Sequence, residues 1–533
     1  MTPSTFIPPC VLHEDEHLLV VNKPAGWNTH SPSPYAGEGI YEWLKHREPR
    51  WAHLAIIHRL DKETSGVMVF GKTQLANRSL TEQFARRAVR KTYVLLSERS
   101  PKRAEFTIKA RIVRAGDRYV SGNHGEEAET RFEIRNPKSE IRNAEGQLIP
   151  CCELAADPRT GRTHQIRVHA AANGFPIMGD ALYGGAPFGR LCLHARELFL
   201  THPVSQAPVT FTAAPDFLAD PSMALRTAII EPGGTDAFRL IHGASDRWPH
   251  WYVEQFGEHL LSQSENPLTA AQQARLQSEP RSVYQKALTR RVRGATAAQS
   301  SPHLVMGRPA PERFVIHENG VKFAISFNEG YSVGLFLDQR ENRRRLLTRH
   351  ISAGFPLGAD LKVLNTFAYT CGFSACAAKA GAHTTSLDLS KKYLEWGKHN
   401  FALNELDPIR HDFLYGDTFD WLKRLARKGR NFDVVILDPP TFSQSKEHGV
   451  FRAEKDYGKL VKAALPVLNP GGVLFASTNA AERAPEKFLG QINDAITHAG
   501  RKIVQQHYVP QPPDFPISRD EPAYLKTVWL RVS

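Results

Sequence analysis

The stretch HRLDKETSG, residues 58–66, places Asp61 in a polar turn between two apolar runs. Ile56 and Ile57 precede this turn and GVMVF follows it, so we expect the turn to join two strands. Loops that are held by rigid strands often carry catalytic groups. A carboxylate in such a place can act as a nucleophile or as a general base. Taken alone, an aspartate beside an arginine is more often half of a weak surface ion pair.

Two later segments carry side chains that could serve the same site. RRAVRKTYVLL, residues 86–96, runs from a basic helix end into a strand that holds Tyr93. DPRTGRTHQIRVH, residues 157–169, contains a tight turn and then an alternating run that predicts a half-buried strand, with Arg162 and Arg167 at the junction. An arginine near a carboxylate favours its charged form, and an aromatic ring can stack on a planar partner. Each piece by itself also has an ordinary structural explanation.

The C-terminal half contains a different kind of site. VLNTFAYTCGFS, residues 363–374, runs from a strand through a turn into a helix, which is where α/β sheets hold nucleotide-like cofactors. Asn365, Phe367 and Gly372 are the candidate cofactor-binding residues of this turn. Asp388 ends the next predicted strand, where a carboxylate can accept hydrogen bonds from ribose hydroxyls.

A third acid in the same region could reach an adenine amino group. Asp417 in LYGDTFDWL is the candidate, and Asp412 is its rival. The alternative interpretation for either residue is a helix N-cap, because aspartate is among the preferred N-cap residues and a helical pattern follows.

DPPTF, residues 438–442, ends an apolar strand. The two prolines terminate the strand and stiffen the turn, so that Asp438 and Phe442 face the crevice above the strand ends. Strand termination explains the two prolines, but it does not explain why an aspartate and an aromatic residue accompany them. Asp438 and Phe442 are therefore candidates for ligand contacts in that crevice.

The elements that must position these side chains differ between the two halves. Short β-branched strands and Gly/Pro turns predict a mostly antiparallel α+β domain over residues 1–218. From residue 313 to residue 533, strands alternate with helices, which predicts an α/β doubly wound, Rossmann-like domain. Residues 219–312 are assigned to an accessory region and linker. The closing run AYLKTVWLRV, residues 523–532, suits an edge strand.

Length and composition are consistent with this division. A chain of 533 residues exceeds the size of one hydrophobic core, so at least two domains are expected. Apolar residues at 41% and charged residues at 23% are ordinary for a soluble globular protein. The formal net charge of +13 favours polyanionic partners, with nucleic acid as the first candidate.

Targeting and metal-binding signals are missing from the sequence. The N-terminus has neither a basic n-region nor a long apolar h-region, which argues against secretion. No apolar run reaches the roughly 18 residues that a membrane span needs. The six cysteines include no C-x-x-C pair, so they indicate neither a disulfide framework nor a zinc site. We expect a cytoplasmic protein without a metal.

One basic segment lies in the accessory region. RSVYQKALTRRVRG, residues 281–294, carries five basic residues, no acid and one aromatic residue, Tyr284. A solvated charged helix is the ordinary interpretation. The alternative is a surface that follows the phosphates of a nucleic acid.

Ordered motifs across about residues 11–215 resemble the pseudouridine synthases that modify ribosomal RNA and some transfer RNA. These motifs are VNKPAG, HRLDKETSG, RKTYVLL, TGRTHQIRVH, PIMGDALYG and LHARELFLTHPV. The resemblance implies an enzyme that isomerises uridine to pseudouridine without a cofactor. Asp61 would be the catalytic carboxylate, and Tyr93 would stack on the uracil. Arg162 would be the cation beside Asp61, with Arg167 as second choice and RNA contact, and Arg59 would help to hold the extruded uridine.

The C-terminal half resembles class I S-adenosylmethionine-dependent methyltransferases over about residues 231–533. ENGVKFAISFNEGYSVGLFLDQRENRR, residues 318–344, together with DPPTFSQSK, resembles the branch that methylates bases of large-subunit ribosomal RNA. TDAFRLIHGASD, residues 235–246, resembles the accessory RNA-binding region of that branch. The resemblance implies S-adenosylmethionine as cofactor and RNA as partner, with Phe442 as an RNA contact.

The chain departs from that family at two places. Cys371 stands where the cofactor turn usually has glycine, which would weaken the turn if the position needs a positive φ. In FASTNAAER, residues 475–483, the strand ends in Ser477, Thr478 and Asn479, where relatives that methylate carbon five of cytosine carry a nucleophilic cysteine. We therefore favour methylation of a nitrogen atom, with guanine preferred to cytosine.

The leading hypothesis is one polypeptide with two RNA-modifying sites, a pseudouridine synthase followed by a methyltransferase. The alternative is an RNA-binding ribosome-assembly factor in which only the synthase site is active. Methylation of protein or DNA is a weaker third interpretation.

Overall fold

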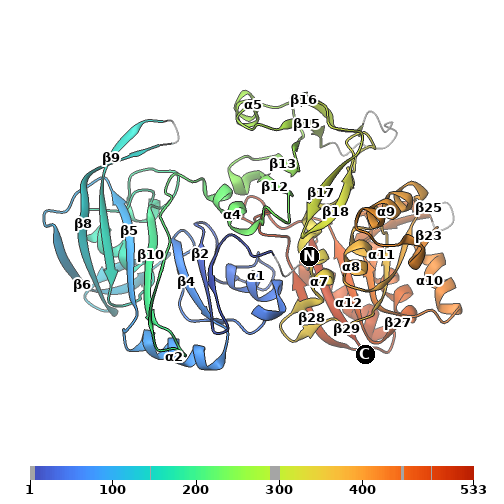
Figure 1. Ribbon diagram of the computed structural model, residues 1–533, viewed down its shortest axis with the longest axis horizontal. Coiled ribbons are helices and arrows are strands. Elements are labelled where there is room, and N and C mark those ends of the chain that lie inside the picture. Colours follow the sequence, from blue (N-terminus) through green and yellow to red (C-terminus); the bar gives the residue numbers. More distant parts are fainter. Residues whose placement is uncertain (1–5, 144–145, 289–299, 446–448, 482) are drawn as a thin grey trace.

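The structure is a computed structural model that describes residues 6–143, 146–288, 300–445, 449–481 and 483–533. Its three main sheets have 11, 5 and 7 strands and follow one another along the chain. Figure 1 shows the large N-terminal sheet at one end, the C-terminal sheet at the other and the smaller sheet above their junction. No helix among the described residues is both long and apolar enough to cross a membrane.

The N-terminal sheet is almost entirely antiparallel and has the order β1-β2-β4-β10-β5-β9-β8-β6-β7, with β3 and β11 paired at its sides. The exception is the parallel pairing of β10 with β4, where His194 lies opposite Ser65. The strands are β1 (Val11–Glu14), β2 (Leu18–Lys23), β3 (Ala55–Ile56), β4 (Ser65–Gly71), β5 (Arg90–Ser97), β6 (Glu105–Ala115), β7 (Arg118–Gly122), β8 (Glu126–Arg142), β9 (Leu148–Pro158), β10 (Leu193–Thr201) and β11 (Pro208–Thr212). Helices α1 (Ile40–Arg47), α2 (Gln74–Ala85) and α3 (Gln165–Ala172) accompany it. The predicted α+β class is confirmed.

The strand predicted at HQIRVH is wrong, because these residues begin helix α3. The prediction rested on alternating polarity, but every residue from Gln165 to Ala170 is buried. The polar members are buried because each has a polar partner: Gln165 binds Thr160 and Thr130, for example. In this segment, a polar side chain therefore does not indicate an exposed position.

The C-terminal sheet has the order β23-β22-β21-β24-β27-β29-β28. Its first five strands are parallel, and β29 runs antiparallel to both of its neighbours. The strands are β21 (Lys362–Thr366), β22 (His383–Asp388), β23 (Asp412–Tyr415), β24 (Phe432–Leu437), β27 (Leu468–Thr478), β28 (Ile503–Val509) and β29 (Lys526–Val532). Helices α8 (Gly372–Lys379), α9 (Lys391–Leu403), α10 (Thr418–Arg427), α11 (Ala453–Ala464) and α12 (Pro485–His498) connect them. The predicted doubly wound sheet is confirmed.

The closing strand is not at the edge of this sheet. β29 lies between β27 and β28, so the prediction of an edge strand is wrong. Residues 526–530 of this strand are all buried, as expected for an interior strand that is covered on both faces.

The accessory sheet contains the first half of the basic segment. Its order is β12-β13-β14-β15-β16, with β12 (Ala237–His242), β13 (Trp251–Phe256), β14 (His259–Ser264), β15 (Ser282–Ala287) and β16 (His303–Met306); α4 (Pro221–Ile229) precedes it and α5 (Ala270–Gln277) lies within it. Tyr284 and Lys286 belong to β15 and are only 6% and 8% exposed. Neither a charged helix nor a phosphate-tracking surface describes this part, and residues 289–294 lie outside the described residues.

Helix α7 (Arg340–Thr348) lies where the N-terminal domain meets the C-terminal part of the molecule, as Figure 1 shows. Its arginines are buried and pair with carboxylates from different parts of the chain. The pairs are Arg340 with Asp514, Arg343 with Glu318, and Arg344 with Glu48. The Arg344–Glu48 pair joins α7 to the N-terminal domain, and the other two pairs join it to residues of the C-terminal part. Breaking any of them would leave an unpaired buried charge, which is strongly destabilising.

Candidate functional sites

The loop between β3 and β4 holds Asp61 in a fixed position. The Thr29 hydroxyl donates to the Leu60 carbonyl over 2.8 Å, and the Leu60 amide donates back to the same hydroxyl oxygen over 3.3 Å. The buried ammonium of Lys23 donates to the carbonyl of Lys62 over 3.1 Å. The backbone on both sides of Asp61 is thus held by hydrogen bonds from Lys23 and Thr29.

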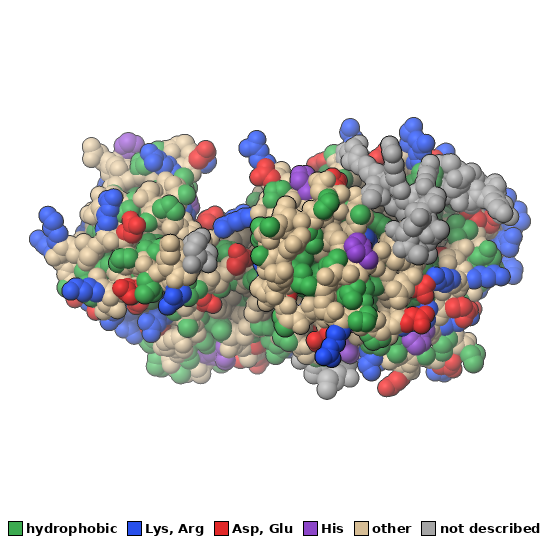
Figure 2. All heavy atoms as spheres, turned by 90° about the horizontal axis from the view of Figure 1, so that it is seen from above, with side chains coloured by type: hydrophobic (Ala, Val, Ile, Leu, Met, Phe, Trp, Pro, Cys, Tyr) green, Lys and Arg blue, Asp and Glu red, His purple; other side chains and the backbone are tan. Residues whose placement is uncertain are grey.

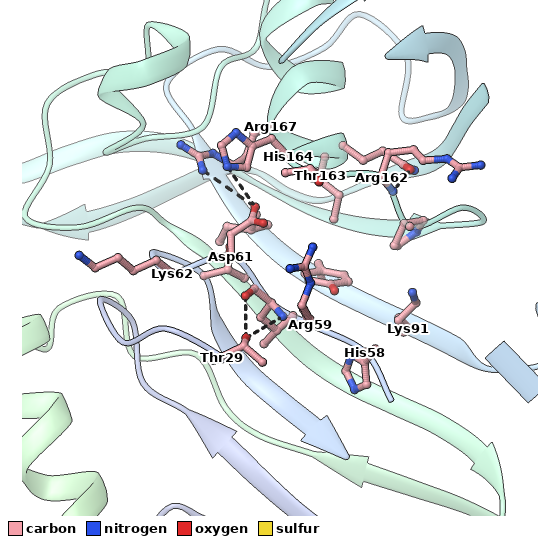
Figure 3. A pocket seen from close by; sticks show the side chains of 18 of the residues that line it. Thr29, His58, Arg59, Asp61, Lys62, Lys91, Arg162, Thr163, His164 and Arg167 are labelled. Carbon is pink, nitrogen blue, oxygen red and sulfur yellow. Dashed lines mark hydrogen bonds and ion pairs between the residues drawn. The ribbon is translucent and has the colours of Figure 1, made fainter. Parts of the chain in front are cut away.

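Asp61 lies in the wall of a pocket of about 680 Å³. The pocket is formed by the Asp61 loop, strand β5 and the turn that leads into α3. Its lining includes Arg59, Lys91, Tyr93, Arg162, Thr163, His164 and Arg167. Figure 3 shows Asp61 and the labelled side chains of this lining.

Two basic side chains from the α3 region, Arg167 and His164, face the Asp61 carboxylate (Figure 3). Its Oδ2 lies 3.9 Å from Nη1 of Arg167 and 4.0 Å from Nε2 of His164. Asp180 holds Arg167 in a bidentate pair, with distances of 2.7 and 2.8 Å. The remaining nitrogen, Nη1, is buried and has no hydrogen-bond partner among the described residues, so it is available to Asp61 or to a bound substrate.

Arg162 does not occupy the predicted place beside Asp61. Its guanidinium donates to Glu126 over 2.9 Å and to the Glu127 carbonyl over 3.1 Å, and it points away from Asp61 in Figure 3. The expected arrangement is therefore corrected: Arg167 is the arginine next to the carboxylate. Arg162 precedes α3 in an exposed turn, whereas Arg167 lies on the buried helix.

Burial dominates the electrostatics of this pocket. It raises the pKa of the Asp61 carboxyl, while the positive charges of His164 and Arg167 act in the opposite direction. Burial, and then the charge of Asp61, also raise the pKa of the Tyr93 hydroxyl. Tyr93 therefore stays protonated near neutral pH, and its phenol can donate a hydrogen bond.

His164 is a site residue that the sequence interpretation missed. It has a left-handed backbone with φ of 55°, at the N-terminus of α3. Its Nδ1 lies 2.9 Å from the Tyr183 hydroxyl, which directs Nε2 toward Asp61. Its place between the two arginines of the TGRTHQIR motif was the available signal.

Lys91 also lines the pocket without an anionic partner. Its Nζ lies 5.5 Å from the centroid of the Phe84 ring and forms no ion pair with any residue that the structure describes. Burial lowers the pKa of this ammonium. A desolvated cation at the wall of a polar pocket is a suitable contact for a phosphate group.

The second candidate site lies at the carboxyl ends of β21, β22 and β24. The turn from β21 into α8 places Phe367, Tyr369 and Cys371 in the left-handed region, with φ of 56°, 49° and 62°. Cys371 therefore occupies the conformation that favours glycine, as expected for this departure. Such residues each cost about 1–3 kcal/mol and persist at sites where the surrounding structure imposes them.

The side chain of Asn365 does not reach this crevice. It is 1% exposed, and its amide donates to the Ser374 hydroxyl over 3.0 Å beneath α8. The prediction of a cofactor contact is corrected to a supporting role, because almost no surface of Asn365 is open to a ligand. Gly372 begins α8, where an added Cβ would lie 3.0 Å from Leu335. Phe367, in contrast, is partly exposed at the turn.

Asp388 ends β22 and helps to shape the turn. Its carboxylate accepts hydrogen bonds from the amides of Tyr369 and Ser390, both over 2.8 Å. Burial raises its pKa, and these two hydrogen bonds oppose the shift. Because Asp388 is half-buried at the carboxyl end of its strand, it remains in a position to face a ribose.

Asp417 and Asp412 lie at different ends of strand β23. Asp412 begins β23 and binds Arg430 over 2.6 Å, so it lies at the end of the strand opposite the crevice. Asp417 follows the carboxyl end of β23, next to Gly416, whose amide donates to the Asp388 carbonyl over 3.0 Å. Asp417 also accepts from the amides of Phe419 and Asp420, which is the N-cap role foreseen as its alternative.

Asp438 follows β24 and lies among polar groups. The Gln339 amide lies 3.3 Å from one Asp438 oxygen and 2.8 Å from the Ser477 hydroxyl. Burial and the charge of Asp338 raise the pKa of Asp438 to about 6, against hydrogen bonds that lower it. This carboxylate therefore titrates close to neutral pH, as a group that exchanges a proton with substrate should.

Phe442 and the cysteines complete this region. Phe442 begins β25 (Phe442–Ser445) and is 36% exposed. Cys371 and Cys376 are buried, and burial raises the pKa of both thiols, to about 12 for Cys371. Neither thiol is in a state to serve as a nucleophile.

Comparison with known families assigns a domain to each site. The family model for RNA pseudouridylate synthases matches residues 17–172, which contain Asp61, Tyr93 and Arg167. The model for S-adenosylmethionine-dependent methyltransferases matches residues 262–531, which contain the C-terminal sheet. Both predicted resemblances are thereby confirmed.

Individual relatives match the C-terminal part. A ribosomal RNA large subunit methyltransferase of Deinococcus radiodurans is 33% identical over 59% of this chain and 78% of its own. Ribosomal RNA large subunit methyltransferase I of Cronobacter sakazakii is 32% identical over 56% of this chain and 76% of its own. The crystal structure of SMU.776 complexed with SAH is 29% identical, with a TM-score of 0.51, covering 61% of this chain and 85% of that one.

Proposed function

Because the chain belongs to the S-adenosylmethionine-dependent methyltransferases and carries an RNA pseudouridylate synthase domain before the methyltransferase domain, we propose that it modifies large-subunit ribosomal RNA at two sites. One site isomerises a uridine, and the other methylates a base. The names of the relatives support the choice of RNA. The single observation that carries the proposal is that each domain has a carboxylate, Asp61 or Asp438, at the centre of a polar site.

Asp61 is the reacting group of the synthase site. Pseudouridine formation breaks the bond between the ribose and a ring nitrogen and forms one to a ring carbon, which requires a carboxylate near the sugar. Arg167 and His164 lie within 4.0 Å of Asp61 and stabilise its charged form as the reaction proceeds. Tyr93 also lines the pocket and stacks on the uracil, and the exposed Arg59 of the same lining holds the extruded nucleotide.

Replacing Arg167 should impair this site far more than replacing Arg162. We expect about a 10²-fold loss of pseudouridine formation in an Arg167→Met/Asp180→Asn double variant, because the cation that stabilises Asp61 is gone. The second change avoids leaving Asp180 as an unpaired buried charge. Arg162→Met, the matched control on the exposed turn, should lose less than about threefold. Both variants are compared in single-turnover assays of pseudouridine formation on ribosomal RNA fragments. If they lose activity equally, Arg167 is not the arginine that supports Asp61.

Lys91 contributes to RNA binding. We expect Lys91→Met to raise KM for RNA with kcat nearly unchanged, and to reduce the slope of log Kd against log salt by about one. Lys109→Met is the matched control, because that ammonium is 73% exposed and already pairs with Glu129. A Lys91 variant with the salt dependence of the wild type would rule out a phosphate contact.

The methyltransferase crevice suits S-adenosylmethionine. Asp388 and Asp417 both lie at carboxyl ends of adjacent parallel strands, where their half-buried carboxylates can accept hydrogen bonds from ribose and adenine. The turn that contains Phe367 and Gly372 would border the cofactor. When bound, S-adenosylmethionine supplies an electrophilic methyl group. Asp438 then accepts a hydrogen bond or a proton from the acceptor base.

The acceptor is a base nitrogen, with guanine preferred to carbon five of cytosine. Attack on carbon five requires a thiolate, and the chain has six cysteines, of which only Cys371 and Cys376 lie in the methyltransferase domain. Both are buried, and burial raises the pKa of both thiols. Mass spectrometry of nucleosides from RNA methylated by the purified chain tests this: N-methylguanosine is expected, and 5-methylcytidine would contradict it.

Electrostatic attraction to RNA is distributed over the molecule. In Figure 2, Lys and Arg side chains lie at both ends of the face shown, with Asp and Glu among them. The same view shows a hollow between the N-terminal domain and the larger remaining part. Phe442 supplies an exposed ring for stacking near Asp438, which is the usual way to bind an unpaired base.

Mapping modified nucleotides tests both activities together. Ribosomal RNA from cells with and without the gene should differ by a pseudouridine and by a methylated base. An assembly factor with only the synthase site active would change the pseudouridine alone. Titration of S-adenosylmethionine into the full chain separates these cases, because the assembly factor would not bind the cofactor.

A further inference from the structure

A cluster of metal-ligating side chains lies where the N-terminal domain meets the C-terminal sheet. Glu38 precedes α1, His46 lies on α1, and His507 lies on β28. One ligand atom from each residue lies within 4.8 Å of the other two. Neither catalytic site uses these residues.

The imidazole of His507 lacks a partner inside this cluster. Its Nε2 is shielded from solvent and forms no hydrogen bond with any described residue. Its ring centroid lies 4.4 Å from that of His46, whose Nδ1 is 2.6 Å from the Glu38 carboxylate. A buried polar atom without a partner is destabilising, and a bound ion would satisfy it.

Histidine binds a metal ion through neutral imidazole. His350 lies outside this cluster, because its Nε2 lies 3.2 Å from the Lys45 carbonyl.

Arg345 restricts which ion fits. Its Nη2 lies 3.6 Å from the Glu38 carboxylate, while its other nitrogens donate to the carbonyls of Ile351 and Glu341. It orients the carboxylate but repels a cation. An ion at this site must therefore bind strongly to imidazole nitrogen. Magnesium and calcium prefer oxygen ligands, whereas zinc binds imidazole well, so zinc is favoured.

We propose that Glu38, His46 and His507 form a zinc site that joins the synthase domain to the methyltransferase domain. Two imidazoles and a carboxylate leave a fourth, tetrahedral position for water. Zinc–ligand bonds of 2.0–2.1 Å place ligand atoms about 3.3 Å apart, so the Glu38–His46 contact opens slightly as the ion enters. Because the ligands come from both domains, the ion fixes α1 against β28.

Zinc binding by the full chain tests the site. After treatment with EDTA and transfer to metal-free buffer, the protein is reconstituted with zinc chloride and freed of excess ion. We expect about one bound zinc per chain and a melting temperature at least about 2 °C above that of the metal-free protein. Cobalt(II) in place of zinc should give the visible absorption of tetrahedral coordination.

Ligand variants identify the residues that hold the ion. His46→Gln and His507→Gln should each reduce bound zinc at least about tenfold and remove the zinc-dependent rise in melting temperature. His498→Gln is the matched control, because that ring on α12 binds the Asp494 carbonyl at the exposed surface. Less than stoichiometric zinc in the wild type, or equal zinc in ligand variants and control, overturns the proposal. The cobalt spectrum of the wild type decides the case if a ligand variant fails to fold.

Discussion

Asp61→Asn should abolish pseudouridine formation, with a loss of at least about 10³-fold in single-turnover rate, as for other groups that react directly with substrate. The amide keeps the size of the side chain but has neither the negative charge nor the basicity of the carboxylate. Arg167 and His164 would then face a neutral group. Pseudouridine in a ribosomal RNA fragment, measured after modification by the purified chain, gives the result directly.

The controls for Asp61→Asn are a neighbouring acid and the second activity. Glu63 lies 3.6 Å from Arg167 in the same loop but is 50% exposed, so Glu63→Gln should keep most of the activity. Methylation by the Asp61 variant should be unchanged, because Asp61 lies in the N-terminal domain and not in the methyltransferase domain. An Asp61 variant that still forms pseudouridine at the wild-type rate would remove Asp61 from the chemistry.

The sequence was sufficient to predict that Asp61 and Tyr93 would share one pocket, but not which residues would lie beside Asp61. Asp61 and Tyr93 sit on a short loop and a strand whose patterns are local, and both line the pocket. The choice between Arg162 and Arg167 depended on whether residues 165–169 form a strand or a helix. Asp180, which holds Arg167 in place, lies beyond that helix, and no periodicity indicates this contact.

Contacts between distant segments were beyond the reach of sequence patterns in the second half as well. Asp412 and Asp417 are near neighbours along the chain, yet they lie at opposite ends of β23, and only the sheet register separates them. A metal-free protein was expected because cysteine spacing is a local signal. Glu38, His46 and His507 have no such spacing, since folding brings β28 against α1.

Asp438→Asn should reduce methylation about 10²–10⁴-fold, which is the contribution expected of a positioned general base. The asparagine oxygen can still accept a hydrogen bond, but it cannot take a proton from the acceptor nitrogen. Cofactor binding should change much less, because Asp388 and Asp417 are the proposed contacts to the nucleoside of the cofactor. Transfer of a radioactive methyl group to RNA measures the rate, and calorimetry with S-adenosylmethionine measures binding.

The pH dependence gives an independent check on the same carboxylate. Burial and the charge of Asp338 raise the pKa of Asp438 to about 6, above the ordinary value for aspartate. Asp438 is therefore protonated and inactive below that pH, and methylation should increase as the pH rises through about 6. In Asp438→Asn this rise should disappear from the residual activity, whereas Asp417→Asn should retain it with weaker cofactor binding. A rise that persists in Asp438→Asn would mean that another group, such as Asp338, provides the titrating carboxylate.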